Sequence, residues 1–337
     1  MLNAAICGLG RWGRTLVDSV QGTSDTIRFV AACATSPDKH RDYCAEKKLR
    51  LVDDYGALLT DTDIDAIVLA TPHSVHADQV AAAAATGRPI YAEKPFALHG
   101  TDAARAVAAC EQAGVVLATG FNRRFQPNFI ALNEAVQNGE LGQILHIEGQ
   151  FSGPTGLNLQ PDFWRATRAE NPGGSMGPRG IHFLDMMIQL AGSEVKQLFC
   201  HSENRVIAAE MDDTTSMLLR FSNGLTGYLS TIFATGEYAR LQVIGTKGWL
   251  EMRGKDRLEG CDVEGNRSER VLEPGDTVRA SLEGFTAAVA GKKPYPVTHD
   301  QMIQGVAAHE AIGLVAGTSG GPTDVVSAAA LRAANAT

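Results

Sequence analysis

Two side chains in the sequence are candidates for moving a proton. His182 lies in "GGSMGPRGIHFLD", where glycines and a proline give way to an apolar, helix-like run. Lys94 lies in "YAEKPF", where a short apolar run ends beside a proline, which is not a typical setting for a surface lysine. Histidine is the commonest general acid or base because its ordinary pKa lies near neutrality. The alternative for His182 is a structural role at the start of a helix, since the chain has nine histidines.

A glycine-spaced loop near the N-terminus points to a phosphate-bearing ligand. In "AAICGLGRWGRTL", Gly8, Gly10 and Gly13 follow an apolar run and precede an amphipathic one. Such spacing allows a tight turn, a close approach of the backbone to a pyrophosphate, and close packing of helix on strand. We therefore predict a dinucleotide site, with a ligand-free turn as the alternative. The loop residues assigned to the cofactor are Gly8, Leu9, Gly10, Arg11, Trp12 and Gly13.

The residue that distinguishes NAD from NADP binding lies about 20 residues after the glycine loop, where NAD-preferring enzymes commonly carry an acid. In "VAACATSPDKH" this place falls on Ala34, followed by Thr35 and Ser36, with Lys39 nearby. Hydroxyl donors and a cation suit a 2′-phosphate, and no carboxylate stands at that position to repel it. The sequence favours NADP, with NAD as the alternative.

The elements that would position these residues fall into two groups. In the first third, apolar runs such as "NAAIC", "IRFVAAC" and "DAIVLATP" alternate with helical, alanine-rich runs, which predicts an α/β domain with a doubly wound parallel sheet. Further on, "SMLLRFSNGLTGYLSTIF" reads as a hairpin around Asn223-Gly224. We expect a dinucleotide-binding Rossmann domain over residues 1–122. An α+β domain with a largely antiparallel sheet, for substrate binding and oligomerisation, is expected over 123–337.

The composition and charge of the chain exclude two classes of partner. The chain has 337 residues, of which 44% are hydrophobic, and a formal net charge of −8 without a basic run, so neither nucleic acid nor a membrane is expected. Its six cysteines are scattered, and its first residues lack the pattern of a signal peptide. We expect a cytoplasmic protein.

Taken in order, these segments resemble the Gfo/Idh/MocA oxidoreductases. The resemblance rests on the glycine loop, "EKP", "GFNRRF", "GELG", "GIHFLD", "VIGTKG" with "WLEM", and "EGFTAAV", and it runs essentially end to end. It implies reversible hydride transfer between a nicotinamide ring and a secondary alcohol carbon, usually of a sugar or cyclitol. It also implies a homodimer or homotetramer, a cis bond before Pro95, and Lys94 beside the nicotinamide.

The resemblance assigns further residues to the cofactor and the substrate. Those expected along the cofactor are Thr71, Pro72, His73, His76, Glu93 and Lys94. Asn122 and Arg123 are candidates for contacts near the nicotinamide or the substrate, and Arg124 for the same or for a structural link between domains. His73 and His76 have metal-ligand spacing but no thiol or third histidine beside them, so we expect no metal.

The sequence departs from the resemblance at one catalytic position. The usual segment reads roughly D-x-G-x-H-x-x-D, and here the histidine is His182, the later acid is Asp185, and Pro178 takes the place of the earlier acid. Proline can neither accept a proton nor orient a lysine. Either Lys94 and His182 suffice, with Asp185 binding a substrate hydroxyl, or the alcohol chemistry is impaired.

Several arginines are candidates for substrate contacts. Trp164, Arg165 and Arg168 precede the histidine segment, and Arg179 lies within it. If two or more of these arginines face the cleft, they favour an anionic substrate such as a sugar acid. A guanidinium group can donate two parallel hydrogen bonds to the two oxygens of one carboxylate. The chain is thus expected to be an NAD(P)-dependent oxidoreductase of a polyhydroxylated substrate. Two alternatives stay open, namely an enzyme that uses the nicotinamide transiently to cleave a glycoside, and a non-enzymatic dinucleotide sensor.

Overall fold

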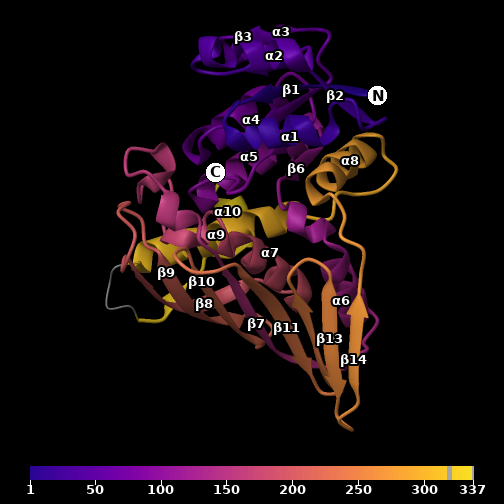
Figure 1. Cartoon of the computed structure of the whole chain (residues 1–337), viewed down its shortest axis with the longest axis vertical. Helices are drawn as coiled ribbons and strands as arrows, with labels where there is room; N and C mark the ends of the chain where they lie inside the picture. The colour runs from indigo at the N-terminus through magenta and orange to yellow at the C-terminus, as the bar shows by residue number, and fades with distance from the viewer. Residues whose placement is uncertain (317–320, 336–337) are drawn as a thin grey trace.

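The computed structural model describes residues 1–316 and 321–335, so the expectation for 123–337 is examined only within those limits. Two sheets lie at opposite ends of the molecule, and helices fill the space between them (Figure 1). No helix of the described chain combines the length and the apolar character that a membrane crossing needs.

The N-terminal sheet has six parallel strands in the order β3-β2-β1-β4-β5-β6. Its central strands are almost wholly buried, as expected where helices cover both faces. This confirms the doubly wound sheet. The strands are β1 (Leu2–Cys7), β2 (Ile27–Cys33), β3 (Arg50–Val52), β4 (Ala66–Leu69), β5 (Ile90–Ala92) and β6 (Leu117–Thr119). The helices between them are α1 (Arg11–Val20), α2 (Arg41–Lys47), α3 (Tyr55–Thr60), α4 (His76–Ala84) and α5 (Gly100–Ala113).

The second sheet has nine strands in the order β14-β13-β12-β11-β7-β10-β9-β8-β15. All neighbours are antiparallel except β7 and β10, which confirms the largely antiparallel sheet. The predicted hairpin joins β9 to β10, and Gly224 has a φ of 89° in its turn. The strands are β7 (Ile144–Ser152), β8 (Val195–Glu203), β9 (Thr214–Phe221), β10 (Thr226–Ile232), β11 (Tyr238–Gly245), β12 (Gly248–Arg253), β13 (Arg257–Asp262), β14 (Arg267–Val271) and β15 (Thr323–Asp324).

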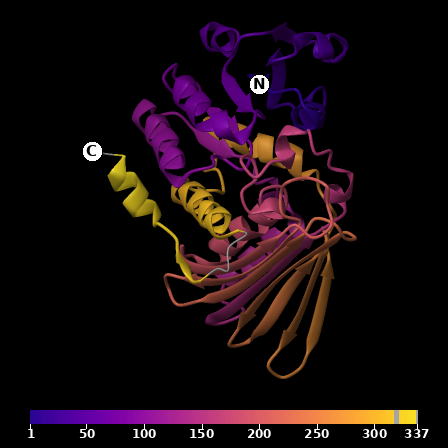
Figure 2. The same cartoon turned by 90° about the vertical axis from the view of Figure 1, so that its left-hand side faces the viewer.

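The remaining helices connect the two sheets. They are α6 (Pro127–Gln137), α7 (Gly180–Ala191), α8 (Thr277–Val289), α9 (His299–Val315) and α10 (Ala328–Ala334). Helix α7 packs on β7 and β10 and is apolar nearly all round because it is covered on its other side by α9. Helices α9 and α10 pack against α5, and α8 packs against α1, so late segments of the chain return to the first domain (Figure 2). The boundary at residue 122 stays a prediction.

Candidate functional site

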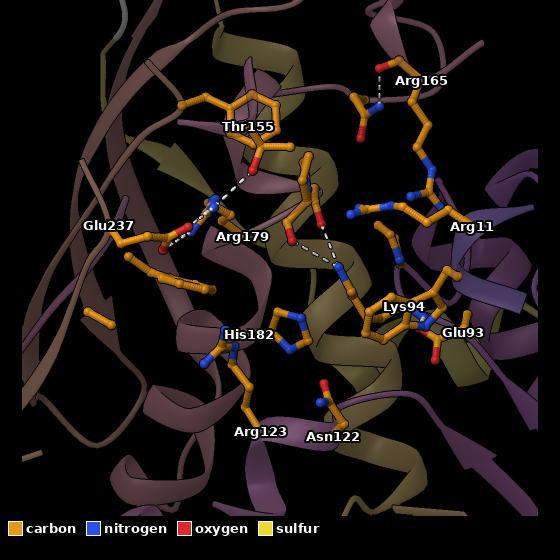
Figure 3. A pocket seen from close by; sticks show the side chains of 18 of the residues that line it. Arg11, Glu93, Lys94, Asn122, Arg123, Thr155, Arg165, Arg179, His182 and Glu237 are labelled. Carbon is orange, nitrogen blue, oxygen red and sulfur yellow. Dashed lines mark hydrogen bonds and ion pairs between the residues drawn. The ribbon is translucent and has the colours of Figure 1, made fainter. Parts of the chain in front are cut away.

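A cavity of about 690 Å³ opens between the carboxyl edge of the parallel sheet and the second sheet (Figure 3). Both domains supply its walls, so side chains from distant parts of the sequence meet there. The predicted site residues among its lining are Arg11, Trp12, His73, Glu93, Lys94, Asn122, Arg123, Arg165, Arg179 and His182.

The glycine loop beside the cavity has the shape that a pyrophosphate requires. A Cβ atom on Gly8 would lie 2.5 Å from the carbonyl oxygen of Ala70, and one on Gly13 would lie 1.9 Å from the carbonyl oxygen of Gly8. A Cβ on Gly10 would meet nothing within 4 Å, so the backbone there is open to a ligand. Gly10 caps α1 without a side-chain hydrogen bond, which leaves N–H groups of the first turn free for an anion. The loop therefore fits a dinucleotide.

Lys94 follows β5 and points into the cavity (Figure 3). The Lys94–Pro95 bond is cis, as the resemblance implies. Lys94 Nζ donates hydrogen bonds to the carbonyl oxygens of Pro178 at 3.0 Å and Gly177 at 3.4 Å. The expectation that a proline cannot orient this lysine is thus wrong, because the main-chain oxygen of Pro178 accepts a hydrogen bond from Lys94 that the proline ring could not accept.

Burial sets the protonation of the lysine and of the acid before it. Desolvation lowers the pKa of Lys94, and the charges of Arg165, Arg123 and Arg179 act in the same direction. Desolvation likewise raises the pKa of Glu93, against the opposing effects of Trp12 and Lys94. A lysine with a lowered pKa can exchange a proton near neutral pH.

His182 lies in the first turn of α7, with 6% of its surface exposed. Burial lowers its pKa well below the ordinary value, and Lys94, Arg123 and Arg179 lower it further. Its ring meets the rings of Phe121 and Phe151 edge to face, at 6.0 and 6.4 Å between centroids. These effects favour the uncharged imidazole at neutral pH.

Arg179 and Arg123 both pack on the Phe151 ring, and the Arg179 Cζ lies 5.0 Å from its centroid. Arg179 forms a two-bond ion pair with Glu237 at 2.7 and 2.9 Å and also donates to Thr155 Oγ1 at 2.9 Å (Figure 3). Arg123 Cζ lies 4.1 Å above the Phe151 ring, and its Nη1 donates to Gln126 Oε1 at 3.3 Å. Desolvation lowers the pKa of Arg123 to about 10, and the charge of Arg179 adds to this effect.

The two predicted loop histidines hold backbone segments together. His76 Nδ1 lies 3.2 Å from Pro95 O and its Nε2 lies 3.0 Å from Thr71 O. His73 Nδ1 lies 3.0 Å from Glu170 O, and its ring contacts Trp164 at 5.4 Å. Burial lowers the pKa of both histidines. Within residues 1–316 and 321–335, no cluster of three or more histidine, cysteine or acidic residues is arranged to hold a metal.

Asp185 does not reach the cavity. Arg124 binds its two carboxylate oxygens at 2.7 and 2.8 Å, and both side chains are almost completely buried. Arg124 also donates to Pro296 O at 3.2 Å, so it ties α7 to the segment before α9. The expected contact between Asp185 and a substrate hydroxyl is therefore not supported, because the acid is already fully paired.

Other predicted residues also lie outside the cavity lining. The arginine at 168 pairs with Asp212 at 2.7 Å instead of facing the cleft, whereas Trp164 supports its neighbour Arg165, whose Cζ lies 4.7 Å from the indole ring. Ala34 is buried at the end of β2, with Thr35, Ser36 and Lys39 exposed after it. The remaining residues outside the lining are Gly8, Leu9, Gly10, Gly13, Thr71, Pro72 and His76.

The sequence interpretation did not single out Phe151, Glu237 or Lys255 as part of this cavity. They come from the end of β7, the connection between β10 and β11, and the turn between β12 and β13. No local motif marks these positions, because only the order and register of the second sheet bring these ends to the cavity.

Comparisons with known proteins agree with this geometry. Residues 2–121 match an oxidoreductase family with an NAD-binding Rossmann fold, GFO_IDH_MocA. Residues 129–251 match the GFO/IDH/MocA C-terminal domain.

Relatives cover most of the chain. The myo-inositol 2-dehydrogenase of Thermotoga maritima is 29% identical over 286 residues, which are 80% of this chain and 81% of the relative. The oxidoreductase YrbE of Bacillus subtilis is 31% identical over 318 residues, 89% of each chain. The fold matches that of the aldose-aldose oxidoreductase from Caulobacter crescentus, with a TM-score of 0.82, 24% identity, and coverage of 92% of this chain and 96% of that one.

Proposed function

The chain belongs to the Gfo/Idh/MocA oxidoreductase family, and from this premise we propose that it is an NADP-dependent dehydrogenase or reductase. Its substrate would carry a secondary alcohol or ketone on a sugar, cyclitol or sugar acid. The relatives named above include an inositol dehydrogenase, and a D-xylose 1-dehydrogenase (NADP(+)) of Haloferax volcanii is 28% identical over 82% of this chain and 87% of its own.

One observation carries the proposal. Lys94 and His182 line the same cavity, next to a glycine loop that is shaped for a pyrophosphate. When bound there, the nicotinamide supplies the hydride donor or acceptor. Lys94 comes from the first domain and His182 from the second, so only the folded pair of domains brings the two proton-transferring groups to one substrate.

Lys94 and His182 would share the transfer of the alcohol proton. His182 is uncharged because it is buried beside cations, and a free ring nitrogen would take the proton as the alcohol is oxidised. Lys94, held by the carbonyl oxygens of Pro178 and Gly177, would hydrogen-bond the reacting oxygen and exchange a proton with it. In the reverse direction the same two groups return the proton.

The preference for NADP rests on the end of β2. Residues 34–36 carry no carboxylate, and the exposed hydroxyls of Thr35 and Ser36 with the nearby Lys39 suit a 2′-phosphate. Arg14 adds a second cation at this end, since its Nη2 lies 3.0 Å from His40 Nδ1 in the turn that follows.

The first experiment is calorimetric titration of the apoprotein with NADPH, NADP, NADH and NAD at fixed salt. We expect the phosphorylated pair to bind at least tenfold more tightly. In Ala34→Asp the new carboxylate should repel the 2′-phosphate and remove this preference, whereas Ala34→Ser should keep it. Equal affinities for both pairs in the wild type would contradict the NADP assignment.

Turnover with a panel of sugars, cyclitols and sugar acids then tests the chemistry. We expect Lys94→Ala and His182→Ala to lower kcat by about 100-fold or more, since general acid–base groups contribute roughly 10²–10⁴-fold, while dinucleotide binding persists. Tight dinucleotide binding without turnover of any compound would favour a sensor. Glycoside cleavage without net change in the nicotinamide would favour the transient use of the hydride.

A further inference from the structure

The cavity holds more positive charge than its own acids balance. Arg179 is neutralised by Glu237 through two hydrogen bonds. Lys94 directly follows Glu93, whose carboxyl group favours the charged form of the lysine. Glu237 is thus bonded directly to Arg179, whereas Glu93 acts on Lys94 and Arg165 through its charge.

Two further cations lie at the end of the cavity next to the glycine loop. Arg11 lies in the loop itself, and Arg165 reaches toward it from the second domain (Figure 3). Desolvation lowers the pKa of Arg165, and the charge of Arg11 adds to this effect against the opposing charges of Glu93 and Glu170. The two negative charges of a dinucleotide pyrophosphate would account for this pair.

Arg123 and Lys255 are left over. In the described part of the chain, neither forms an ion pair with a carboxylate, although the charge of Glu237, which is bonded to Arg179, acts on both. The Arg123 guanidinium is fixed by stacking on Phe151 and by its single hydrogen bond to Gln126. It lies on the same side of the cavity as His182, away from Arg11 and Arg165 (Figure 3).

A second, smaller cavity of about 170 Å³ adjoins this position, and we call it the side recess. Its lining includes Arg123, Lys255 and Asn122, which also line the main cavity, together with Gln126 and Thr277. The two cations therefore stand where a substituent could extend from a substrate bound beside Lys94 and His182.

Resting on the proposed function, we infer that the substrate carries an anionic group, a carboxylate or a phosphate, which Arg123 and Lys255 bind at the side recess. A guanidinium presents two parallel N–H donors that match two oxygens of such a group. Arg123 is partly buried, and Glu237 acts on it through its charge without bonding to it. An anionic substrate would supply the directly bonded partner that this guanidinium lacks, which a neutral polyol of the same shape would not.

The test compares three sugars that differ only at carbon 6, D-glucuronate, D-glucose 6-phosphate and D-glucose, together with their galacto and manno epimers. Each is titrated calorimetrically into the protein saturated with NADP. We expect at least one anionic sugar to bind tenfold or more tightly than its neutral counterpart. Preference for the glucuronate or for the phosphate series identifies which anionic group the recess accepts.

Variants tie this preference to the named residues. Arg123→Ala should weaken anion binding by roughly 10- to 100-fold, as expected for a hydrogen-bonded charge pair. Arg123→Lys, which keeps the charge without the fork, should lie between Arg123→Ala and the wild type. Lys255→Ala should weaken binding by a factor of about three, since this side chain is exposed. Lys293→Ala removes an exposed lysine outside both cavities and should change nothing.

The outcomes separate this inference from the proposed function. Anion binding that depends on Arg123 without turnover would keep the recess and remove the dehydrogenase. Turnover of neutral sugars, with no anionic epimer binding more tightly, would keep the dehydrogenase and overturn the recess. Anion binding that Arg123→Ala leaves unchanged would also overturn it.

Discussion

The side-chain nitrogen of Lys94 lies 3.0 Å from the main-chain oxygen of Pro178. Related sequences commonly place an acidic side chain at this position, as the resemblance implies, whereas here a neutral carbonyl oxygen orients the lysine. A carbonyl fixes the direction of the ammonium group but adds no full negative charge to stabilise it. The contact with Pro178 therefore holds the lysine in place without adding a charge, and Glu93 is the acid whose charge acts on its pKa.

Replacing Pro178 with an acid should shift the pH dependence of alcohol oxidation. In Pro178→Asp, a carboxylate beside Nζ favours the ammonium form and raises the pKa of Lys94. If neutral Lys94 takes part in accepting the proton, the rise of kcat/KM with pH moves upward by about one unit or more. The measurement is a pH profile of kcat/KM in both proteins.

Pro178→Asn is the matched control, because it has nearly the same size as aspartate without the charge. Its profile should stay near that of the wild type. An unchanged profile in Pro178→Asp would mean that another group, such as His182, titrates in this range.

Substitutions in the glycine loop should have two different effects, a loss of stability at Gly13 and a loss of cofactor affinity at Gly10. In Gly13→Ala the new methyl group would overlap the carbonyl oxygen of Gly8, so the free energy of unfolding should fall by roughly 1–3 kcal/mol. In Gly10→Ala it meets nothing in the protein, so stability should be kept while NADPH affinity drops about tenfold or more. Urea denaturation and calorimetric titration measure the two effects, and a stable Gly10→Ala that binds NADPH normally would contradict the loop's assignment.

Because Asp185 is paired with Arg124, we expect a substitution of Asp185 to lower the stability of the protein rather than its affinity for substrate. Asp185→Asn leaves a buried guanidinium without its counter-charge, so we expect a loss of about 3–5 kcal/mol. The double variant Arg124→Met/Asp185→Leu should recover part of this, since no charge then remains buried. A stable Asp185→Asn protein with a raised KM would instead restore the substrate role.

His309 predicts a loss of stability in acid. It is fully buried in α9, and desolvation lowers its pKa from the ordinary 6.5 to about 4. Between these values the unfolded chain binds a proton that the folded protein does not, so the free energy of unfolding falls as pH decreases below about 6.5.

For this one group the loss between pH 7 and pH 5 is roughly 2 kcal/mol. His309→Gln cannot titrate, so its loss over the same range should be smaller by about that amount, as measured by urea unfolding at both pH values. His73, His76 and His182 have lowered pKa values as well and should leave a residual acid sensitivity in the variant. Equal losses in the two proteins would contradict the contribution of His309.

The sequence by itself was sufficient to predict the features that depend on local sequence patterns. Alternating apolar and helical runs predicted the parallel sheet, and Asn223-Gly224 predicted the β9–β10 hairpin, because turn and strand preferences act over a few residues. The spacing of Gly8, Gly10 and Gly13 likewise indicated the phosphate loop, since one strand–helix junction contains the whole motif.

Only the tertiary structure decided how the charged side chains are paired. Asp185 and Arg124 are 61 positions apart, which is too far for a local sequence pattern to relate them. Their ion pair keeps Asp185 away from the cavity. Glu237 reaches Arg179 because strand order brings two loops together, and this contact leaves Arg123 as an unpaired cation near His182. Side-chain pairing depends on distances across the folded chain, so residue types reveal the candidates but not their partners.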